Sequence, residues 1–232
     1  MTTASPDRRV PRRSPAPGQR HSDGDRTRAA LLDAALEEFA AKGFAGARVR
    51  DIAQRAGVSK DLISYHFGGK DGLYLAVQQA WLHREDGFAD PGLPLADLLP
   101  RYLHDALVDS RPMRLLAWRG LAGPDEAPPD GTPGPEDLSG TRERQQRGEL
   151  PADIDPAVLR LVLLAVVAAP LVFPDYARKL FGTATSDPGF EARYASGLQR
   201  LLAHLSQTGG TFGRSLGGDE APGGAGQTKN AS

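Results

Sequence analysis

The sequence predicts an all-α protein with a three-helix helix-turn-helix head, a linking helix and a larger helical-bundle body. Apolar residues recur at the i, i+3, i+4 and i+7 spacing of a helix along most of the chain. Glycine and proline interrupt this pattern at short intervals, and no stretch shows the alternation of a strand. The 40% apolar and 25% charged composition is typical of a globular domain with a buried core.

Both ends of the chain are expected to be disordered. Residues 1–24 mix Pro, Arg, Ser and Gly, and residues 207–232 are rich in Gly. Neither segment can bury enough apolar surface to offset the entropy lost on ordering. Between them we place the helix-turn-helix head at residues 25–70 and the larger helical body at residues 71–206.

The first expected helix begins near Asp25 and ends at Lys42, because Gly43 is suited to a left-handed C-terminal cap. Its apolar side chains fall on one face, which is expected to pack against other helices. A short second helix starts at Val49, and Gly57 then allows a sharp turn.

The third expected helix follows Ser59, which we predict as its N-cap. Helical spacing turns one set of its side chains inward, namely Leu62, Ile63, His66 and Phe67. The opposite face carries Lys60, Asp61, Ser64 and Tyr65. A fourth helix starts at Lys70 and links the head to the body.

The body is expected to contain six further helices, several of which begin with proline in the first turn. Residues 123–135, rich in Pro, Gly and acidic side chains, form the one long loop. The helices are expected at residues 95–108, 112–121, 136–148, 156–169, 171–181 and 188–205.

Composition and motifs exclude several classes of function. The chain has no cysteine, which excludes disulfides, thiolate zinc sites and cysteine nucleophiles. The longest apolar run, residues 161–173, is shorter than the roughly 20 residues of a membrane span and is broken by Pro170. Phosphate-binding loops, dinucleotide fingerprints and nucleophile motifs are absent from the sequence. We therefore expect a cytoplasmic protein that is not an enzyme and has no membrane segment, metal or cofactor.

Charge is unevenly distributed along the chain. Residues 1–72 carry 13 Lys and Arg against 9 Asp and Glu, whereas the remainder carries 15 against 20. A basic front on an acidic body is typical of a protein with a DNA-binding head. The N-terminal arginines are either a solvated tail or an arm that grips DNA beside the head. They are Arg8, Arg9, Arg12, Arg13, Arg20, Arg26 and Arg28.

Residues 49–67 have the pattern of a helix-turn-helix, in which a protruding second helix enters the major groove of DNA. Lys60 and Lys70 stand at helix starts, where a cation opposes the helix dipole unless an anion such as a phosphate is near. Tyr65 and His66 can donate to phosphate oxygens, and Asp61 can accept from a cytosine amino group.

Residues 26–82 resemble the N-terminal domain of the TetR family of bacterial regulators. The resemblance is carried by R-x-x-L-L-D-A-A-L-E-E-F-A-A-K-G-F, R-D-I-A-Q-R-A-G-V-S-K and Y-H-F-G-G-K-D-G-L. It implies a homodimer that reads a palindromic operator and holds an effector pocket in its body. It also implies phosphate and base contacts at Arg50, Ser59, Lys60, Asp61, Leu62, Ser64, Tyr65, His66 and Lys70.

The sequence departs from the commonest family pattern at three of these positions. Asp61 stands where glycine is frequent, Leu62 where threonine is frequent, and Ser64 where an aromatic residue is frequent. All three are compatible with a helix, so the departures affect the operator sequence that is read and leave the fold intact.

The body offers candidate sites that also have simpler explanations. Five side chains either line an effector cavity or belong to the core, namely Tyr102, Leu115, Trp118, Phe173 and Tyr176. Following the resemblance, dimerisation is expected through residues 156–173 and 188–205, although the same apolar face would also suit a monomer core. His83 and His104 lack the further ligands that a zinc site needs.

The function expected from these observations is a DNA-binding transcriptional regulator, a repressor released from its operator by a small molecule. One alternative is a constitutive regulator, or one controlled by a protein partner, with no small ligand. Another is a helical enzyme or small-molecule carrier whose N-terminal helices only pack.

Overall fold

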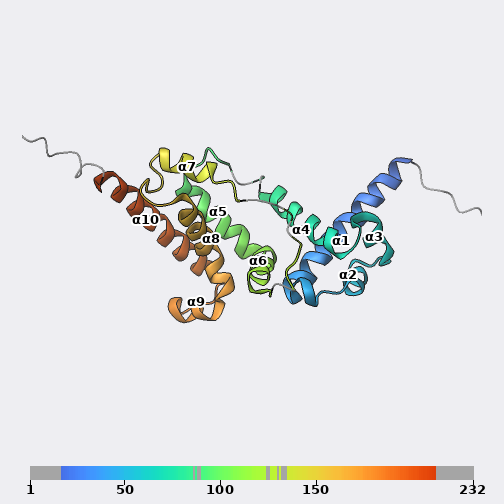
Figure 1. Ribbon diagram of the computed structural model, residues 1–232. Helices are drawn as coiled ribbons and strands as arrows, with labels where there is room; N and C mark the ends of the chain where they lie inside the picture. Colours follow the sequence, from blue (N-terminus) through green and yellow to red (C-terminus); the bar gives the residue numbers. More distant parts are fainter. Residues whose placement is uncertain are drawn as a thin grey trace, which may run out of the picture. The chain divides into compact units, whose positions relative to one another are not determined.

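The computed structural model describes residues 17–85, 87, 90–123, 126–129, 131 and 135–212. Over these residues it contains ten α-helices and no strand, so the all-α prediction is confirmed (Figure 1). They form two compact units, one running up to Leu82 and including 118–131, the other formed by 83–117 and the residues from 132 onward. The first unit therefore includes residues 70–82, which belong to the expected linking helix.

The first unit contains α1 (Pro17–Gly46), α2 (Val49–Ala56), α3 (Asp61–Phe67) and most of α4 (Lys70–Glu85). Its core is built from the apolar stripes that helical spacing predicts. The largest fully buried side chains in it are Leu31, Phe39, Ile52, Ile63, Leu73 and Tyr74. Phe39 and Phe44 both meet the Tyr74 ring edge-on at 5.2 Å, and these contacts fasten α4 to α1.

Helix α1 is interrupted at Gly43, which has φ 69° and ψ 174°, where the sequence predicted the helix to end. The break leaves the Ala40 carbonyl without its helical donor, and Trp118 Nε1 donates to this oxygen at 3.1 Å. A Cβ on Gly43 would lie 3.1 Å from the Trp118 ring. The Trp118 side chain therefore caps α1 at the break, by supplying the hydrogen-bond donor that Ala40 O lacks.

Both segments expected to be disordered are partly helical. Helix α1 begins at Pro17 and α10 (Pro188–Phe212) continues beyond residue 206. Extending an existing helix avoids the cost of nucleation, so helices can run into segments that would not form one alone. Residues 1–16 and 213–232, the outer parts of the expected tails, lie outside the described residues.

The second unit contains α5 (Leu95–Val108), the start of α6 (Arg111–Leu121), α7 (Ser139–Gln146), α8 (Pro156–Val172), α9 (Pro174–Phe181) and α10. Helix α5 packs against both α8 and α10 (Figure 1). The core between them includes Leu98, Leu99, Leu103, Leu159, Phe190, Leu198 and Leu202. Helix α7 is shorter than expected: the Asp137 carboxylate accepts from the Ser139 N–H at 2.9 Å, where the helix starts.

The expectation that Pro170 breaks the helix is wrong, because α8 continues through it to Val172. Proline has no N–H, so Pro170 cannot bond the Val166 carbonyl, and Pro100 inside α5 cannot bond the Ala96 carbonyl. Helix α10 supplies both missing donors. Tyr194 donates its hydroxyl to Val166 O at 2.8 Å, and Gln199 donates its amide to Ala96 O at 3.0 Å.

Tyr194→Phe should lower the stability of the second unit by about 1–2 kcal/mol, because the half-buried Val166 carbonyl then has no donor. Phenylalanine retains the ring that stacks on Phe190, so the change isolates the hydroxyl. Urea denaturation of the variant measures the loss. Tyr176→Phe, at an exposed position in the same unit, serves as the control. Equal stability of both variants and the parent would contradict the role of this hydrogen bond.

Among the described residues, no single helix is long and apolar enough to cross a bilayer. The pair α8 and α9, bent by 87° at the break between them, passes the same test of length and composition only when taken together.

Candidate nucleic-acid interface

Helices α2 and α3 form the two arms of a compact helix-turn-helix. Gly57 adopts the left-handed conformation at φ 69°, and it donates to Gln54 O at 3.2 Å. Val58 donates to Ala53 O at 3.0 Å, which closes the end of α2. Ile52 and Ile63 are fully buried and hold the inner faces of both helices. The turn is thus held by its backbone and its core, leaving the outer side chains available.

The outer face of α3 carries the residues that the sequence assigned to it. Lys60, Asp61, Ser64 and Tyr65 are all exposed, and Tyr65 reaches 81% exposure. Leu62 and His66 are half-buried, on the flank between this face and the core. A side chain that projects from a short exposed helix can reach into the major groove of DNA when the helix docks there.

The start of α3 differs in detail from the prediction. The N-cap position is Lys60, with no side-chain cap, and Ser59 stands one residue before it. The Ser59 hydroxyl accepts from the Asp61 N–H at 3.2 Å and donates to the Asp61 carboxylate at 3.3 Å. Ser59 therefore stabilises the first turn from outside the helix, and one Asp61 oxygen already has a donor.

Lys70 is engaged by the protein itself. Its Nζ lies 3.4 Å from Ala45 O and 4.5 Å above the centre of the Phe44 ring. Burial lowers the pKa of its ammonium group, and the nearby Asp71 opposes that shift. The partial negative charge on the carbonyl oxygens at the C-terminal end of α1 partly offsets the unfavourable position of this cation at a helix start.

A buried carboxylate in the head was missed by sequence reasoning. Glu38 in α1 is almost fully buried, contacts Lys42 one turn later, and lies 3.9 Å from Arg55 in α2. Lys42 also lies 3.6 Å from Asp51, and its hydrogen bond to Glu38 raises its pKa. These charges tie both ends of α2 to α1. The signal was present, since Glu38 lies seven residues after Leu31 on the apolar face.

Arg50 is an exposed side chain on the first turn of α2. Its Nε lies 3.6 Å from the Asp51 carboxylate, and 78% of the side chain is open to solvent. Such a loose surface pair contributes little to stability and leaves the guanidinium available to a phosphate.

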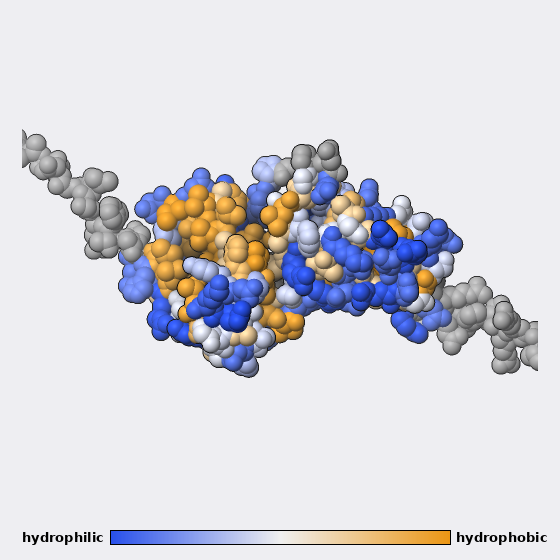
Figure 2. All heavy atoms as spheres, turned by 90° about the horizontal axis from the view of Figure 1, so that it is seen from below, coloured by the Kyte–Doolittle hydropathy of each residue, from blue (hydrophilic) through white to orange (hydrophobic). Residues whose placement is uncertain are grey.

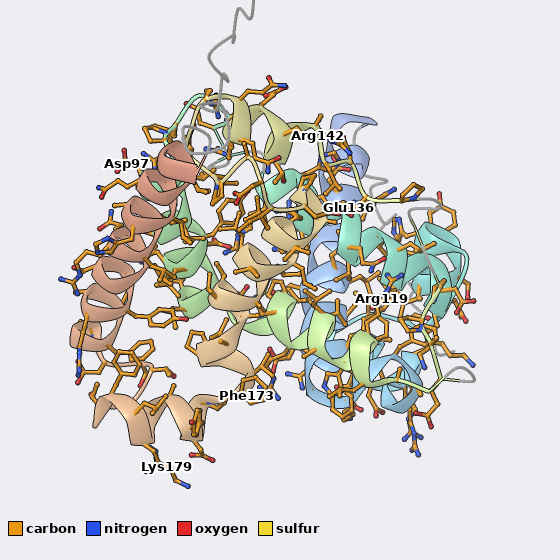
Figure 3. All side chains as sticks on the ribbon, turned by 60° about the vertical axis from the view of Figure 1, so that its left-hand side comes forward. Asp97, Arg119, Glu136, Arg142, Phe173 and Lys179 are labelled. Carbon is orange, nitrogen blue, oxygen red and sulfur yellow. The ribbon has the colours of Figure 1, made fainter. Side chains whose placement is uncertain are left out.

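The five candidate pocket residues of the body have different surroundings in the structure. Trp118 belongs to the first unit and is bonded to α1, whereas Leu115 is buried and Tyr102 half-buried in the second unit. Phe173 and Tyr176 are 61% and 63% exposed. Figure 3 shows Phe173 where α8 gives way to α9. The bend between these helices turns both rings outward.

An apolar face lies open on the second unit. Helical spacing places its α8 members on one side of that helix, and Figure 2 shows apolar side chains gathered over this unit. The exposed members are Val158, Leu161, Val162 and Val172 on α8, and Leu201 on α10. Exposed apolar surface of this kind is common where a protein associates with a partner.

Comparison with known proteins identifies similar regulators. Residues 31–77 match the family described as bacterial regulatory proteins, tetR family. The HTH-type transcriptional regulator RutR of Escherichia coli (strain K12) is 38% identical over 102 residues, which cover 40% of this chain and 48% of RutR. The match thus spans about half the length of that relative.

Two proteins of Streptomyces coelicolor are similar over more of the chain. The HTH-type transcriptional repressor SCO4008 is 29% identical over 166 residues, covering 69% of this chain and 86% of the relative. The crystal structure of the transcriptional regulator SCO4942 aligns with a TM-score of 0.58 and 24% identity over 75% of this chain and 97% of that one. The alignment with SCO4942 shows that the shared fold includes helices of the body as well as the head.

Proposed function

Because the chain belongs to the TetR family of bacterial regulatory proteins, we propose that it is a repressor that leaves a palindromic operator when a small molecule binds. As a transcriptional regulator with a helix-turn-helix, it is a DNA-binding protein and not an enzyme. The observation that carries the proposal is the exposed polar face of α3, held on a rigid helix-turn-helix within the matched residues. We place this activity in the cytoplasm, where bacterial DNA is found.

The proposed DNA contacts divide by chemistry. Arg50 and Lys60 would neutralise phosphates, Tyr65 and His66 would donate to phosphate oxygens, and Asp61 would reach a base edge in the major groove. Side chains on the flank and at the start of α3 would fix its register. The proposed set is Arg50, Ser59, Lys60, Asp61, Leu62, Ser64, Tyr65, His66 and Lys70. The Lys70 ammonium has three N–H donors, so its contact with Ala45 O leaves donors for a phosphate.

The proposed homodimer uses residues 156–173 and 188–205. Exposed Leu161 and Val162 on α8 and Leu201 on α10 supply the apolar surface that association would bury. A two-fold dimer presents two α3 helices, and these can occupy successive major grooves about 34–36 Å apart. The palindrome in the operator would mirror the two-fold axis of the protein.

Similarity to a repressor supports repression as the mode of regulation. SCO4008 is named a transcriptional repressor, and its match covers parts of both units. Of the five candidate effector residues, Leu115 and Tyr102 are the ones shielded within the second unit. A small molecule that raises the melting temperature and weakens operator binding would support this part. If a broad panel gave no stabilisation, the constitutive regulator would be favoured.

Selection of random duplex DNA by the purified protein, followed by sequencing, tests the proposal. We expect enrichment of a two-fold symmetric consensus at a fixed and stated salt concentration, because non-specific binding varies steeply with salt. Absence of enrichment at low salt, with protein shown to be folded, would contradict DNA reading as the function.

Lys60→Gln and Asp61→Ala should have different effects on DNA binding. Lys60→Gln should weaken binding to every duplex and reduce the slope of log K against log salt by about 0.9 for each phosphate that the protein no longer neutralises. Asp61→Ala should leave the slope unchanged and relax the preference at one base pair by about 1–3 kcal/mol. Fluorescence anisotropy titrations over a salt series, with matched single-base operator variants, separate the two. Equal effects of both changes would show that α3 is placed wrongly on the DNA.

A further inference from the structure

Helix α9 leaves α8 at a bend of 87° and is fastened to α10 by its inner face (Figure 1). The Phe181 ring meets Phe190 edge-on at 5.0 Å and Tyr194 edge-on at 5.8 Å. The Arg193 guanidinium carbon lies 5.0 Å from the centre of the Phe181 ring, and the same side chain donates to Phe181 O at 3.3 Å. Ala177 is buried. These contacts fix the orientation of α9 in the second unit, and with it the direction of its outer face.

The outer face of α9 carries three large apolar side chains. Phe173 at the N-cap, Tyr176 and Leu180 follow the i, i+3 and i+7 spacing that places side chains on one face of a helix. Their exposed fractions are 61%, 63% and 61%. Phenylalanine and tyrosine are enriched at protein–protein interfaces relative to the rest of the surface. This face therefore has the composition of an interface.

The outer face of α9 adjoins the exposed apolar face of α8. Val172, in the last turn of α8, is 39% exposed and directly precedes Phe173 at the bend. Leu161 and Val162 are exposed farther back along α8. The proposed dimer interface ends at residue 173, so α9 itself lies outside it. A partner that covers the end of α8 would also meet the start of α9.

The area of exposed apolar surface supports a second copy of this chain as that partner. The exposed apolar side chains of α8 and α10 offer roughly 300 Å², taking about 120 Å² for a fully exposed aliphatic side chain. The three on α9 add roughly another 300 Å², because an aromatic side chain can bury at least about 150 Å². A standard interface buries about 800 Å² per partner, and about 65% of a homodimer interface is apolar, which is about 520 Å². The surface of α8 and α10 falls short of this area alone and reaches it with α9.

We propose that α9 packs on a second copy of this chain through Phe173, Tyr176 and Leu180, so that the dimer interface extends from α8 into α9. The proposal rests on the proposed homodimer and adds a surface outside its two segments. In a two-fold interface each protomer contributes the same surface, so the apolar area of α9 is buried twice.

Thiol labelling tests whether the second copy covers α9. The chain contains no cysteine, so a single introduced cysteine reports on its own position alone. Leu180→Cys keeps both aromatic rings and is labelled with a maleimide above and below the dimer dissociation constant, which sedimentation of the same variant gives. We expect labelling to be at least tenfold slower in the dimer. Leu121→Cys, exposed in the first unit, should be labelled at the same rate at both concentrations.

Removal of the aromatic rings tests whether α9 contributes to association. In the double variant Phe173→Ser and Tyr176→Asp, serine is favoured at the N-cap and an acidic residue is favoured in the first turn, so α9 itself should persist. We expect its dimer dissociation constant to rise at least 100-fold in sedimentation analysis, because apolar surface is lost from both protomers. Leu121→Asp should leave the constant unchanged. Thermal melts check the fold, and if the double variant unfolds, the labelling of Leu180→Cys still decides.

Four results would overturn the proposal. Equal labelling of Leu180→Cys in monomer and dimer shows that α9 is free in the dimer. Slow labelling at every concentration shows that another segment of the same chain covers it, and protection that requires added phosphatidylglycerol vesicles shows that a bilayer does. An unchanged dissociation constant in the folded double variant, with dissociation of Leu161→Asp, leaves the proposed dimer intact without α9. A monomeric parent protein would instead refute the homodimer itself.

Discussion

Gly72→Ala is expected to destabilise the first unit by about 2 kcal/mol. Helix propensity alone predicts the opposite, a gain of up to about 1 kcal/mol when alanine replaces glycine inside a helix. The contact decides the sign, because the new Cβ would lie 1.8 Å from the Phe67 carbonyl oxygen. The Cβ is fixed by the backbone of α4, and the oxygen belongs to the backbone of α3. The clash can therefore be relieved only if α3 and α4 move apart.

Gly120→Ala in α6 is the matched control. A Cβ at Gly120 meets no atom within 4 Å, so this variant should be as stable as the parent or slightly more stable. Urea denaturation of both variants gives the difference in free energy of unfolding. Operator binding should also fall for Gly72→Ala, since α3 is displaced. A Gly72→Ala protein with unchanged stability would show that the two helices separate without cost.

Leu161→Asp is expected to convert the proposed dimer to a monomer and to weaken operator binding at least 100-fold. Leu161 is 65% exposed on the apolar face of α8, so the change leaves the fold of the monomer intact. In a two-fold interface the carboxylate would be introduced twice, and burying unpaired charges costs several kcal/mol. Sedimentation analysis and operator titration measure the two effects.

The control for this variant is Leu121→Asp, at the end of α6. Leu121 is 81% exposed and belongs to the first unit, whereas α8 and α10 belong to the second. It should therefore retain the oligomeric state of the parent. If Leu161→Asp stays dimeric, residues 156–173 do not form the interface, and the exposed face of α8 must serve another partner.

Local sequence rules predicted the parts of the fold that depend on local pattern. Helix α5 has the bounds that were expected, Leu95–Val108, because its apolar spacing and flanking residues agree. In α3 the same spacing separated buried Ile63 from exposed Tyr65. Both results follow from the period of the helix alone.

Features that depend on tertiary partners could not be predicted in this way. Pro170 remains inside α8 because Tyr194, in another helix, bonds the carbonyl that proline leaves open. The contacts of Lys70 with Ala45 O and the Phe44 ring could not be predicted either, because both partners belong to α1. The hydrogen bond from the Trp118 indole to Ala40 O could not be predicted either, because it depends on the break in α1 at Gly43.

The two hydrogen bonds that α10 gives to proline-freed carbonyls also restrict how the second unit can move. Tyr194 hydrogen-bonds to α8 and Gln199 hydrogen-bonds to α5. Helix α10 therefore fixes the positions of α8 and α5 along its own axis. Sliding α10 by a single residue, about 1.5 Å, would strain both bonds together. Helices α5, α8 and α10 should therefore shift as one block, and their slowly exchanging amide hydrogens should exchange with a common free energy of opening.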